Sequence, residues 1–213
     1  MNALAVTHCL LVDDHALFAD AVGLLIAHRH PGVTLTTANS LAEAHAALQV
    51  RPDMALVLLD LTLSDSRGLD TLRRLREWAP LARVIVLSAD DRRDTVLAAL
   101  EAGAAGFIPK TADSTMLDQA LRAVLNGGIY LPPDLQHEAP DDPDDGPWPP
   151  LTARQVDVFR CLVNGLPNKQ IARMLSLSDS TVKTHVQAIY DRLGVTSRAQ
   201  VVVLAARHGW LQD

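Results

Sequence analysis

The chain has 213 residues, of which 48% are hydrophobic and 21% charged, and its formal net charge is −6. So large an apolar fraction excludes an intrinsically disordered protein, and the length allows one large or two small domains. No apolar run approaches the roughly 18 residues that a membrane-spanning helix needs. The first residues lack a basic segment ahead of an apolar stretch, and Cys9 and Cys161 give no disulfide framework. We therefore expect a cytoplasmic protein without membrane association.

Charge divides the chain into three parts. Residues 1–131 hold 11 basic and 15 acidic residues, whereas residues 151–213 hold eight basic and four acidic ones, a net charge of +4. Residues 132–150 contain six acids, no base and seven of the 12 prolines, which favours an extended linker. The alternative is a long surface loop within one domain. We predict a first domain over 1–131, a linker over 132–150, and a basic second domain over 151–213 that meets a polyanion.

Short β-rich runs alternate with amphipathic stretches through the first domain. The apolar runs are Cys9–Val12, Val33–Thr37, Ala55–Leu59, Val84–Leu87 and Gly106–Ile108. The stretches with helical periodicity are His15–His28, Leu41–Val50, Leu69–Trp78, Arg93–Ala102 and Ser114–Asn126. Five strand–helix repeats predict an α/β fold with a five-stranded, doubly wound parallel sheet covered on both faces. In such sheets the chemistry lies beyond the carboxyl ends of the strands.

Polar residues stand where these predicted strands end. The first run is followed by Asp13 and Asp14, the third by Asp60, the fourth by Ser88 and the fifth, after a proline, by Lys110. Parallel strands bring their ends to one edge, so three carboxylates, a hydroxyl and an ammonium group would meet there. Crowded carboxylates repel one another unless a hard cation lies among them, and oxygen ligands suit Mg²⁺. A carboxylate beside a metal can act as a nucleophile and form an aspartyl phosphate.

Four segments of this domain carry a family resemblance. LLVDDH, LVLLDLTLSDSRGLD, VIVLSA and GFIPK resemble, in order and spacing, the signature segments of two-component receiver domains over about residues 7–127. The resemblance implies a flavodoxin-like fold, with Asp60 as phosphoacceptor and a histidine kinase as phosphodonor. It also implies that Asp14, Asp60 and the backbone carbonyl of Thr62 hold Mg²⁺, with Asp13 acting largely through water.

The same resemblance assigns the residues of a conformational switch. Ser88 would follow the phosphoryl group, Lys110 would pair with it, and Phe107 falls at the position of the family's rotating aromatic residue. The alternative for Phe107 is a plain buried strand residue. The sequence departs from the family at Leu63–Ser64, where Met-Pro is usual. Thr62 and Asp90 stand where the family tunes the lifetime of the phosphoryl group.

The second domain shows helical periodicity throughout. The predicted helices are Thr152–Asn164, Asn168–Leu175, Asp179–Leu193 and Ser197–His208. Glycines occupy the expected C-terminal caps at Gly165, Gly194 and Gly209, and hydroxyl residues the expected N-caps at Ser178 and Thr196. We expect a small all-α domain of four helices.

The third of these helices has two distinct faces. Apolar residues form one stripe, which consists of Val182, Val186, Ile189 and Leu193. Polar residues share the opposite face, which carries Lys183, Thr184 and Gln187, and hydroxyls gather at the N-terminus at Ser178, Ser180 and Thr181. Short polar side chains with one cation suit a helix in the DNA major groove, and a helix N-terminus suits a phosphate. The alternative is an ordinary solvated face.

Residues 151–210 look like the LuxR/FixJ-type (NarL/FixJ) helix-turn-helix, most specifically in NKQIA, LSLSDSTVKTHV and LGVTSRAQ. The resemblance implies base contacts from Lys183, Thr184 and Gln187. The phosphate contacts that it implies come from Ser180, Thr181, Lys169 and Arg192. It further implies a dimer surface on the last helix at Val201, Val202 and Leu204, for which the alternative is core packing. Gln155 replaces the family's usual glutamate, which leaves a salt bridge from that site in doubt.

Together these features predict a response regulator and not an enzyme. Phosphorylation of Asp60 would control dimerisation and binding to a near-palindromic operator, because a module of charge +4 binds DNA weakly alone. Two alternatives keep the DNA-binding module, one with a receiver that is never phosphorylated and one with a first domain that senses a small molecule. A third is a phosphatase that uses Asp60 as nucleophile, but such enzymes want a second carboxylate two residues on, where Thr62 stands.

Overall fold

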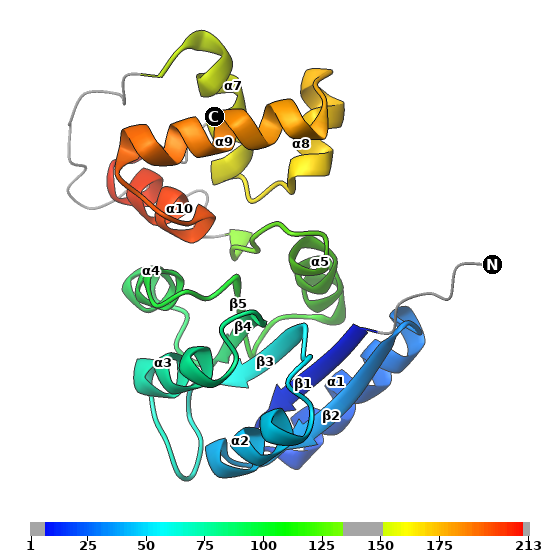
Figure 1. Cartoon of the computed structure of the whole chain (residues 1–213). Coiled ribbons are helices and arrows are strands. Elements are labelled where there is room, and N and C mark those ends of the chain that lie inside the picture. Colours follow the sequence, from blue (N-terminus) through cyan, green and yellow to red (C-terminus); the bar gives the residue numbers. More distant parts are fainter. Residues whose placement is uncertain (1–6, 134–150, 211–213) are drawn as a thin grey trace. The chain divides into compact units, whose positions relative to one another are not determined.

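The computed structural model describes residues 7–133 and 151–210 (Figure 1). The chain forms two compact units, Met1–Asp118 and Gln119–Asp213, and their boundary falls inside helix α5 (Ser114–Leu125). The predicted linker lies outside the described residues except for positions 132 and 133, so the domain limits stay a prediction. Among the described residues, no helix has the length and apolar character needed to cross a bilayer.

The first unit is built on five parallel strands in the order β2-β1-β3-β4-β5. They are β1 (Thr7–Val12), β2 (Val33–Ala38), β3 (Leu56–Asp60), β4 (Arg83–Ser88) and β5 (Gly106–Pro109). The connecting helices are α1 (Ala16–Arg29), α2 (Leu41–Val50), α3 (Leu69–Trp78) and α4 (Arg93–Glu101). Helices α2, α3 and α4 cover one face of the sheet and α1 the other (Figure 1). The doubly wound α/β fold is confirmed, and the predicted ends of its elements differ by at most two residues.

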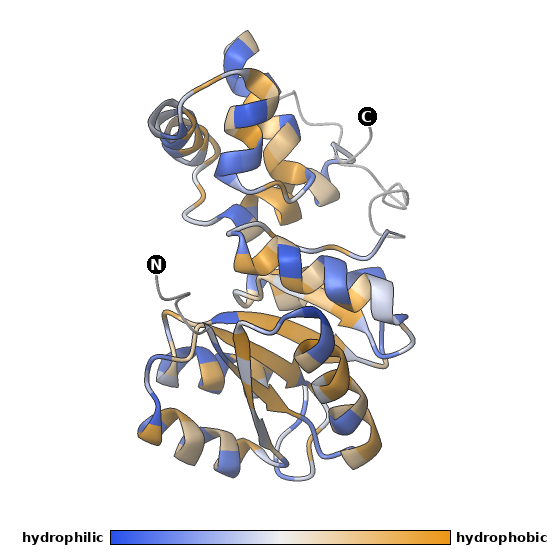
Figure 2. Ribbon diagram, turned by 90° about the vertical axis from the view of Figure 1, so that its right-hand side faces the viewer, coloured by the Kyte–Doolittle hydropathy of each residue, from blue (hydrophilic) through white to orange (hydrophobic). Residues whose placement is uncertain are grey.

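The central strands are buried on both faces. Every residue of β3 and β5 is buried, as are the last four of β1 and the last five of β4. Figure 2 shows the same strands as hydrophobic along most of their length. This burial explains why these strands appear in the sequence as continuous apolar runs instead of alternating ones.

The register of the strands decides which residues meet at their carboxyl ends. Val12 of β1 pairs with Leu59 of β3, so the residues that follow each of them are neighbours. Ser88, the last residue of β4, pairs with Pro109 of β5. The carboxylates after β1 and at the end of β3, and the lysine after β5, therefore reach the same edge of the sheet.

Four helices whose bounds lie within the described residues follow α5 in the second unit (Figure 1). They are α7 (Ala153–Val163), α8 (Asn168–Leu175), α9 (Asp179–Leu193) and α10 (Arg198–Arg207). Their buried faces form one hydrophobic cluster, to which α9 contributes Val182, Val186 and Ile189. The apolar stripe predicted on α9 is thus its core-facing side.

Two of the five predicted helix caps, Ser178 and Gly194, are confirmed, whereas Gly165 and Gly209 each follow the C-cap, which is Asn164 in α7 and His208 in α10. Ser178 is the N-cap of α9 and its Oγ accepts a hydrogen bond from the backbone N of Thr181. Gly194 caps the other end of α9 in the left-handed conformation, with φ 66°. Thr196, however, is not the N-cap of α10. That place belongs to Ser197, whose Oγ accepts from the backbone N of Gln200 at 3.2 Å, and the Gln200 side chain accepts from the backbone N of Thr196 in return.

Candidate functional site

The first candidate site is a cluster of charges at the carboxyl edge of the sheet, centred on Asp60. Lys110 Nζ lies 2.7 Å from Asp60 Oδ2 and 2.9 Å from Asp13 Oδ2. The Asp60 and Asp13 side chains are almost fully buried, with 1% and 0% of their surface exposed. The backbone N of Thr62 donates to the other Asp60 oxygen, Oδ1, at 3.0 Å. Asp60 is therefore held at both oxygens, and the predicted cluster of strand-end residues is present.

The electrostatics of this cluster favour added positive charge. Burial raises the pKa of Asp60, although hydrogen bonds from Lys110 and Thr62 oppose the shift. Burial alone would lower the pKa of Lys110, but Asp60 and Asp13 together raise it. Both groups hold a proton more tightly than in water, as expected where carboxylates outnumber ammonium groups.

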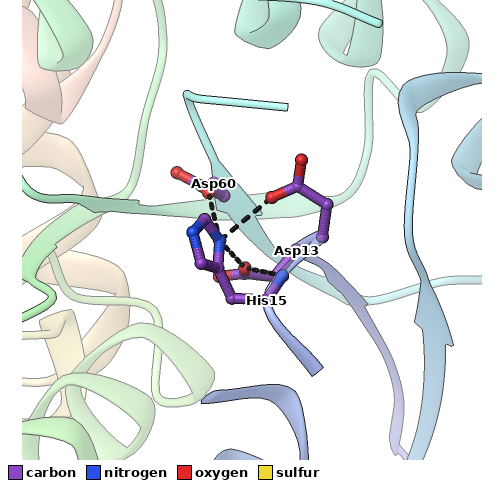
Figure 3. Close-up of side chains that lie close together, drawn as sticks. Asp13, His15 and Asp60 are labelled. Atoms are coloured by element: carbon purple, nitrogen blue, oxygen red, sulfur yellow. Dashed lines mark hydrogen bonds and ion pairs between the residues drawn. The ribbon is translucent and has the colours of Figure 1, made fainter. Parts of the chain in front are cut away.

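His15 completes this cluster, which we call the acidic pocket: Asp13, Asp14, His15, Asp60 and Lys110. Figure 3 shows the imidazole of His15 turned toward Asp13 and Asp60. Its Nδ1 lies 3.1 Å from Asp13 Oδ1, 3.0 Å from Asp14 Oδ1 and 3.8 Å from Asp60 Oδ2. One donor atom from each of Asp13, Asp14, His15 and Asp60 falls within 4.8 Å of all the others, a grouping that could hold a metal ion.

The residues present fit a divalent cation. When ionised, Asp13, Asp14 and Asp60 bring three negative charges, and Lys110 balances only one of them. The two remaining charges are those that a dication would neutralise, and hard oxygen donors are what Mg²⁺ takes. The acidic pocket is thus suited to the metal that the sequence predicted.

The loop after Asp60 is tied to the rest of the fold. Gly68 N donates to Leu61 O at 2.7 Å, and Leu63 N donates to Ser66 O at 3.0 Å, which closes the loop on itself. Asp65 then reaches across to α2, where its carboxylate accepts hydrogen bonds from the backbone N atoms of Leu41 and Ala42. These bonds hold the pKa of Asp65 below its usual value. The loop is fixed by hydrogen bonds although the family's proline is missing.

The predicted switch residues occupy different surroundings. Ser88 is buried at the end of β4, and its Oγ accepts a hydrogen bond from the backbone N of Asp90 at 3.0 Å. Asp90 makes a two-pronged ion pair with Arg92 and also accepts from Thr95, and the Arg92 hydrogen bonds lower the pKa of Asp90. Its carboxylate is thus engaged on the solvent side. Phe107 is fully buried within β5.

The second candidate site is the exposed face of α9. Lys183, Thr184 and Gln187 are all exposed on it, opposite the buried stripe. Thr184 Oγ1 donates to the carbonyl of Ser180, and Gln187 Nε2 donates to Asp191 Oδ1 at 2.9 Å. Two of the three predicted base-reading residues therefore make local hydrogen bonds that they would exchange on binding DNA.

The N-terminus of α9 gathers hydroxyl groups. Ser178 Oγ lies 2.8 Å from Ser180 Oγ and 2.7 Å from Thr181 Oγ1. Lys169 in the first turn of α8 and Arg192 in the last turn of α9 are exposed. These are the predicted phosphate-contacting residues, and the turn between α8 and α9 is formed by Ser176 in the left-handed conformation, with φ 54°.

Two further residues of the helical unit clarify the sequence predictions. Gln155 is buried and forms a capping box with Thr152. The Gln155 side-chain Oε1 accepts a hydrogen bond from the Thr152 backbone N, and Thr152 Oγ1 accepts one from the Gln155 backbone N. Where the family has an acid, this chain therefore keeps a residue that can close the box. Val201 belongs to the hydrophobic cluster of the helical unit. Its side chain therefore packs in the domain core, which is the alternative to the predicted dimer contact.

Comparison with known proteins agrees with this geometry. Residues 9–122 match the family described as response regulator receiver domain, and residues 149–205 match the bacterial regulatory proteins of the luxR family. The chain belongs to the two-component response regulators. Its receiver domain carries the acidic pocket, and its LuxR-type DNA-binding domain carries the exposed face of α9.

Relatives of this response regulator align over nearly its whole length. The glycerol metabolism activator of Pseudomonas putida is 34% identical over 92% of this chain and 93% of its own. The nitrate/nitrite response regulator NarP of Escherichia coli is 33% identical, with 92% of each chain covered. The solved structure of the RcsB response regulator of Salmonella typhimurium shares 18% identity and the fold, with a TM-score of 0.58 over 95% of this chain and 98% of that one.

Two residues in or near the acidic pocket of this response regulator escaped the sequence prediction. His15 directly follows the paired aspartates, so its place in the sequence already signalled a position at the strand edge. Asp65 gave no such signal, because its partners at the start of α2 lie 24 and 23 residues earlier in the chain.

Proposed function

We propose that a histidine kinase phosphorylates Asp60 and that this event controls DNA binding by the LuxR-type domain. The observation that supports it is the contact of Lys110 with both Asp60 and Asp13 at the edge of a parallel sheet. An Asp60 carboxylate oxygen would attack the phosphorus of a phosphohistidine, forming an acyl phosphate while the bond from phosphorus to the donor nitrogen breaks.

Within this proposal the residues of the acidic pocket have separate tasks. Asp14, Asp60 and the Thr62 carbonyl would hold Mg²⁺, with Asp13 acting through water, and the bound cation would neutralise charge that develops on the transferred group. Lys110 would move from Asp60 Oδ2 to a phosphoryl oxygen. Ser88 would exchange its hydrogen bond with the Asp90 backbone for one with the phosphoryl group.

The switch would then reach the rest of the receiver through β4 and β5. Ser88 and Phe107 lie on these neighbouring strands, where Val86 pairs with Phe107 and Ser88 with Pro109. Because Phe107 is fully buried, a change in its rotamer requires its neighbours to repack. Such a repacking would give the receiver two discrete arrangements, which is what a phosphorylation switch needs.

For the helical domain we propose DNA binding as a dimer at a near-palindromic operator. Support comes from the exposure of Lys183, Thr184 and Gln187 on one face of α9, from which they would contact the bases. Two copies double the phosphates that a module of modest charge can neutralise. The protein would act in the cytoplasm, where bacterial DNA lies, and as a regulator, not as an enzyme that turns over an external substrate.

The test is intact-mass measurement after incubation with acetyl phosphate and Mg²⁺. We expect one added phosphoryl group on the wild type and none on Asp60→Asn or in the presence of a metal chelator. A Ser88→Ala variant serves as a control, because it removes a switch residue and leaves the nucleophile in place. An adduct that persists in Asp60→Asn would contradict the assignment, and turnover of an external phosphoester would favour a phosphatase.

A further inference from the structure

We propose that His15 is a fourth protein ligand in the acidic pocket and that it makes the pocket prefer a first-row transition-metal dication, such as Mn²⁺ or Ni²⁺, to Mg²⁺. The inference rests on the cation site of the proposed function and adds a ligand to it. Its basis is the position of one atom, His15 Nδ1, among three carboxylates.

The spacing of the donor atoms is that of one coordination shell. With bonds of about 2.1 Å in an octahedral shell, adjacent ligand atoms lie about 3.0 Å apart and opposite ones about 4.2 Å apart. His15 Nδ1 lies 3.1 Å from Asp13 Oδ1, 3.0 Å from Asp14 Oδ1 and 3.8 Å from Asp60 Oδ2. The separations from Asp14 and Asp60, the two carboxylates that hold the cation in the proposed function, fall within the range that ligands of one ion span.

The local backbone aims the imidazole at the pocket. His15 occupies the N-cap position of α1, where Ser, Thr, Asp or Asn usually caps the helix with its side chain. The His15 side chain makes no capping hydrogen bond. Its backbone N donates to Asp13 Oδ1 at 2.9 Å, which fixes the start of the helix against the pocket. The ring is therefore directed into the acidic pocket instead of toward the helix amides (Figure 3).

His15 Nδ1 is hydrogen-bonded to Asp13 Oδ1 at 3.1 Å, and a bound cation would take the place of that hydrogen bond. Three carboxylate oxygens face Nδ1, and Lys110 Nζ, which can only donate, lies 3.5 Å away. A cation between Nδ1 and the carboxylates lets the ring nitrogen present its lone pair to the metal. Imidazole nitrogen is a good ligand for transition metals, whereas Mg²⁺ strongly prefers oxygen, so a nitrogen donor raises affinity along the series from Mn²⁺ to Ni²⁺.

The test is calorimetric titration of full-length, tag-free protein with Mg²⁺, Mn²⁺ and Ni²⁺, without a phosphodonor. The variants are His15→Ala, His15→Asn and the control His28→Ala, which removes an exposed histidine of α1 outside the pocket. Loss of the ligand in His15→Ala should weaken Ni²⁺ binding about tenfold or more and Mg²⁺ binding less than about threefold. His15→Asn places an amide oxygen near the position of Nδ1, so it should recover Mn²⁺ binding more than Ni²⁺ binding. His28→Ala should match the wild type.

A spectroscopic measurement reports the bond itself. Pulsed electron paramagnetic resonance of the Mn²⁺-loaded wild type should show modulation from a directly bound nitrogen, and this signal should vanish in His15→Asn. Persistence of the nitrogen signal in that variant would overturn the proposal.

The outcomes separate this inference from the proposed function. If His15→Ala tightens binding of all three ions, the imidazole fills the place of the cation and is not a ligand. If His15→Ala weakens binding of Mg²⁺, Mn²⁺ and Ni²⁺ equally, His15 does not give the pocket its proposed preference for transition metals. If the wild type binds no ion, or Asp60→Asn binds as the wild type does, the cation site of the proposed function fails as well.

Discussion

The acidic pocket and the exposed face of α9 are built in opposite ways. The pocket joins residues far apart in the chain: Lys110 and Asp60, 50 residues apart, touch at 2.7 Å, and both side chains are largely buried. The residues of α9 that are predicted to contact DNA lie within one helix, and their hydrogen bonds, such as that from Gln187 to Asp191, span four residues. The pocket therefore forms only when the whole sheet has folded, whereas the exposed face of α9 forms whenever that helix is formed.

This contrast separates stability from function in the two domains. Buried carboxylates are costly to keep ionised, so the receiver gives up stability to hold Asp13 and Asp60 in the acidic pocket. Solvated polar groups on a helix surface cost little, and the stability of α9 comes from the opposite, apolar stripe. Substitutions can test each half of this comparison.

The largest expected effect comes from Ile189→Ala in the core of the helical domain. Ile189 is fully buried, and removing its side chain should cost about 2–5 kcal/mol. DNA binding should be lost while phosphorylation of Asp60 is retained, as measured by circular dichroism melting and intact mass. Leu58→Ala in β3 is the matched control and should impair phosphorylation instead. Loss of phosphorylation in Ile189→Ala would show that the domains do not fold independently.

Lys183→Ala tests the readout by α9. If Lys183 contacts a base edge, the variant should lose about 1–3 kcal/mol of binding free energy on the specific site and little on random DNA. Lys169→Ala, expected to contact phosphate, should weaken both and lower the salt dependence by about one unit of slope. Fluorescence anisotropy at several salt concentrations measures both. An equal loss on specific and random DNA for Lys183→Ala would contradict its role in base reading.

Asp60→Asn tests the cost of the buried carboxylate. Burial raises the folded-state pKa of Asp60, so the folded protein favours the protonated carboxyl group. The stability that this proton contributes is fully present below about pH 3.9 and is lost as pH rises through the raised pKa. At pH 7 the variant should therefore be more stable than the wild type, by on the order of 1 kcal/mol, with no such gain near pH 3.5. Urea unfolding at both pH values measures it, with Asp20→Asn on the exposed side of α1 as control. A less stable variant at pH 7 would show that the Lys110 ion pair outweighs burial.

The smallest effect is expected for Asp65→Ala. The carboxylate of Asp65 binds the amides of Leu41 and Ala42, but it is exposed, so its loss should cost about 0.5 kcal/mol. Because its folded-state pKa is lowered, this contribution is present above about pH 3.9 and is lost as pH falls through the lowered value. Hydrogen exchange of the Leu41 and Ala42 amides should quicken in the variant at pH 7. Unchanged exchange would mean that the loop is fixed without Asp65.

Much of the fold and of the pocket could be predicted from the sequence. The alternation of apolar runs and amphipathic stretches determines a parallel sheet, and the strand ends then locate Asp60 and Lys110. The roles given to the pocket residues and to the α9 residues remain predictions, because geometry places them without showing what they bind; the pocket residues concerned are Asp13, Asp14, Asp60, Ser88 and Lys110.

The features that sequence could not supply depend on side-chain direction and on distant loops. The imidazole of His15 could face solvent or the pocket, and only the backbone at the start of α1 decides this. Asp65 acts on a helix from another part of the chain. Both Ser197 and Thr196 carry a hydroxyl that can cap α10, so the sequence alone did not distinguish them. Ser197 is the cap, and the Gln200 side chain accepts a hydrogen bond from the backbone N of Thr196, which selects this arrangement.

The most direct test of the central claim is whether phosphorylation at Asp60 changes DNA affinity. Binding sites would first be selected from random duplexes with full-length protein treated with acetyl phosphate and Mg²⁺. Fluorescence anisotropy would then compare treated and untreated wild type with treated Asp60→Asn on the selected site. We predict paired half-sites and an affinity at least about tenfold higher for the treated wild type, with no gain in the variant. Equal affinity of all three samples, with phosphorylation verified by mass, would contradict the account and leave a DNA-binding protein with a silent receiver.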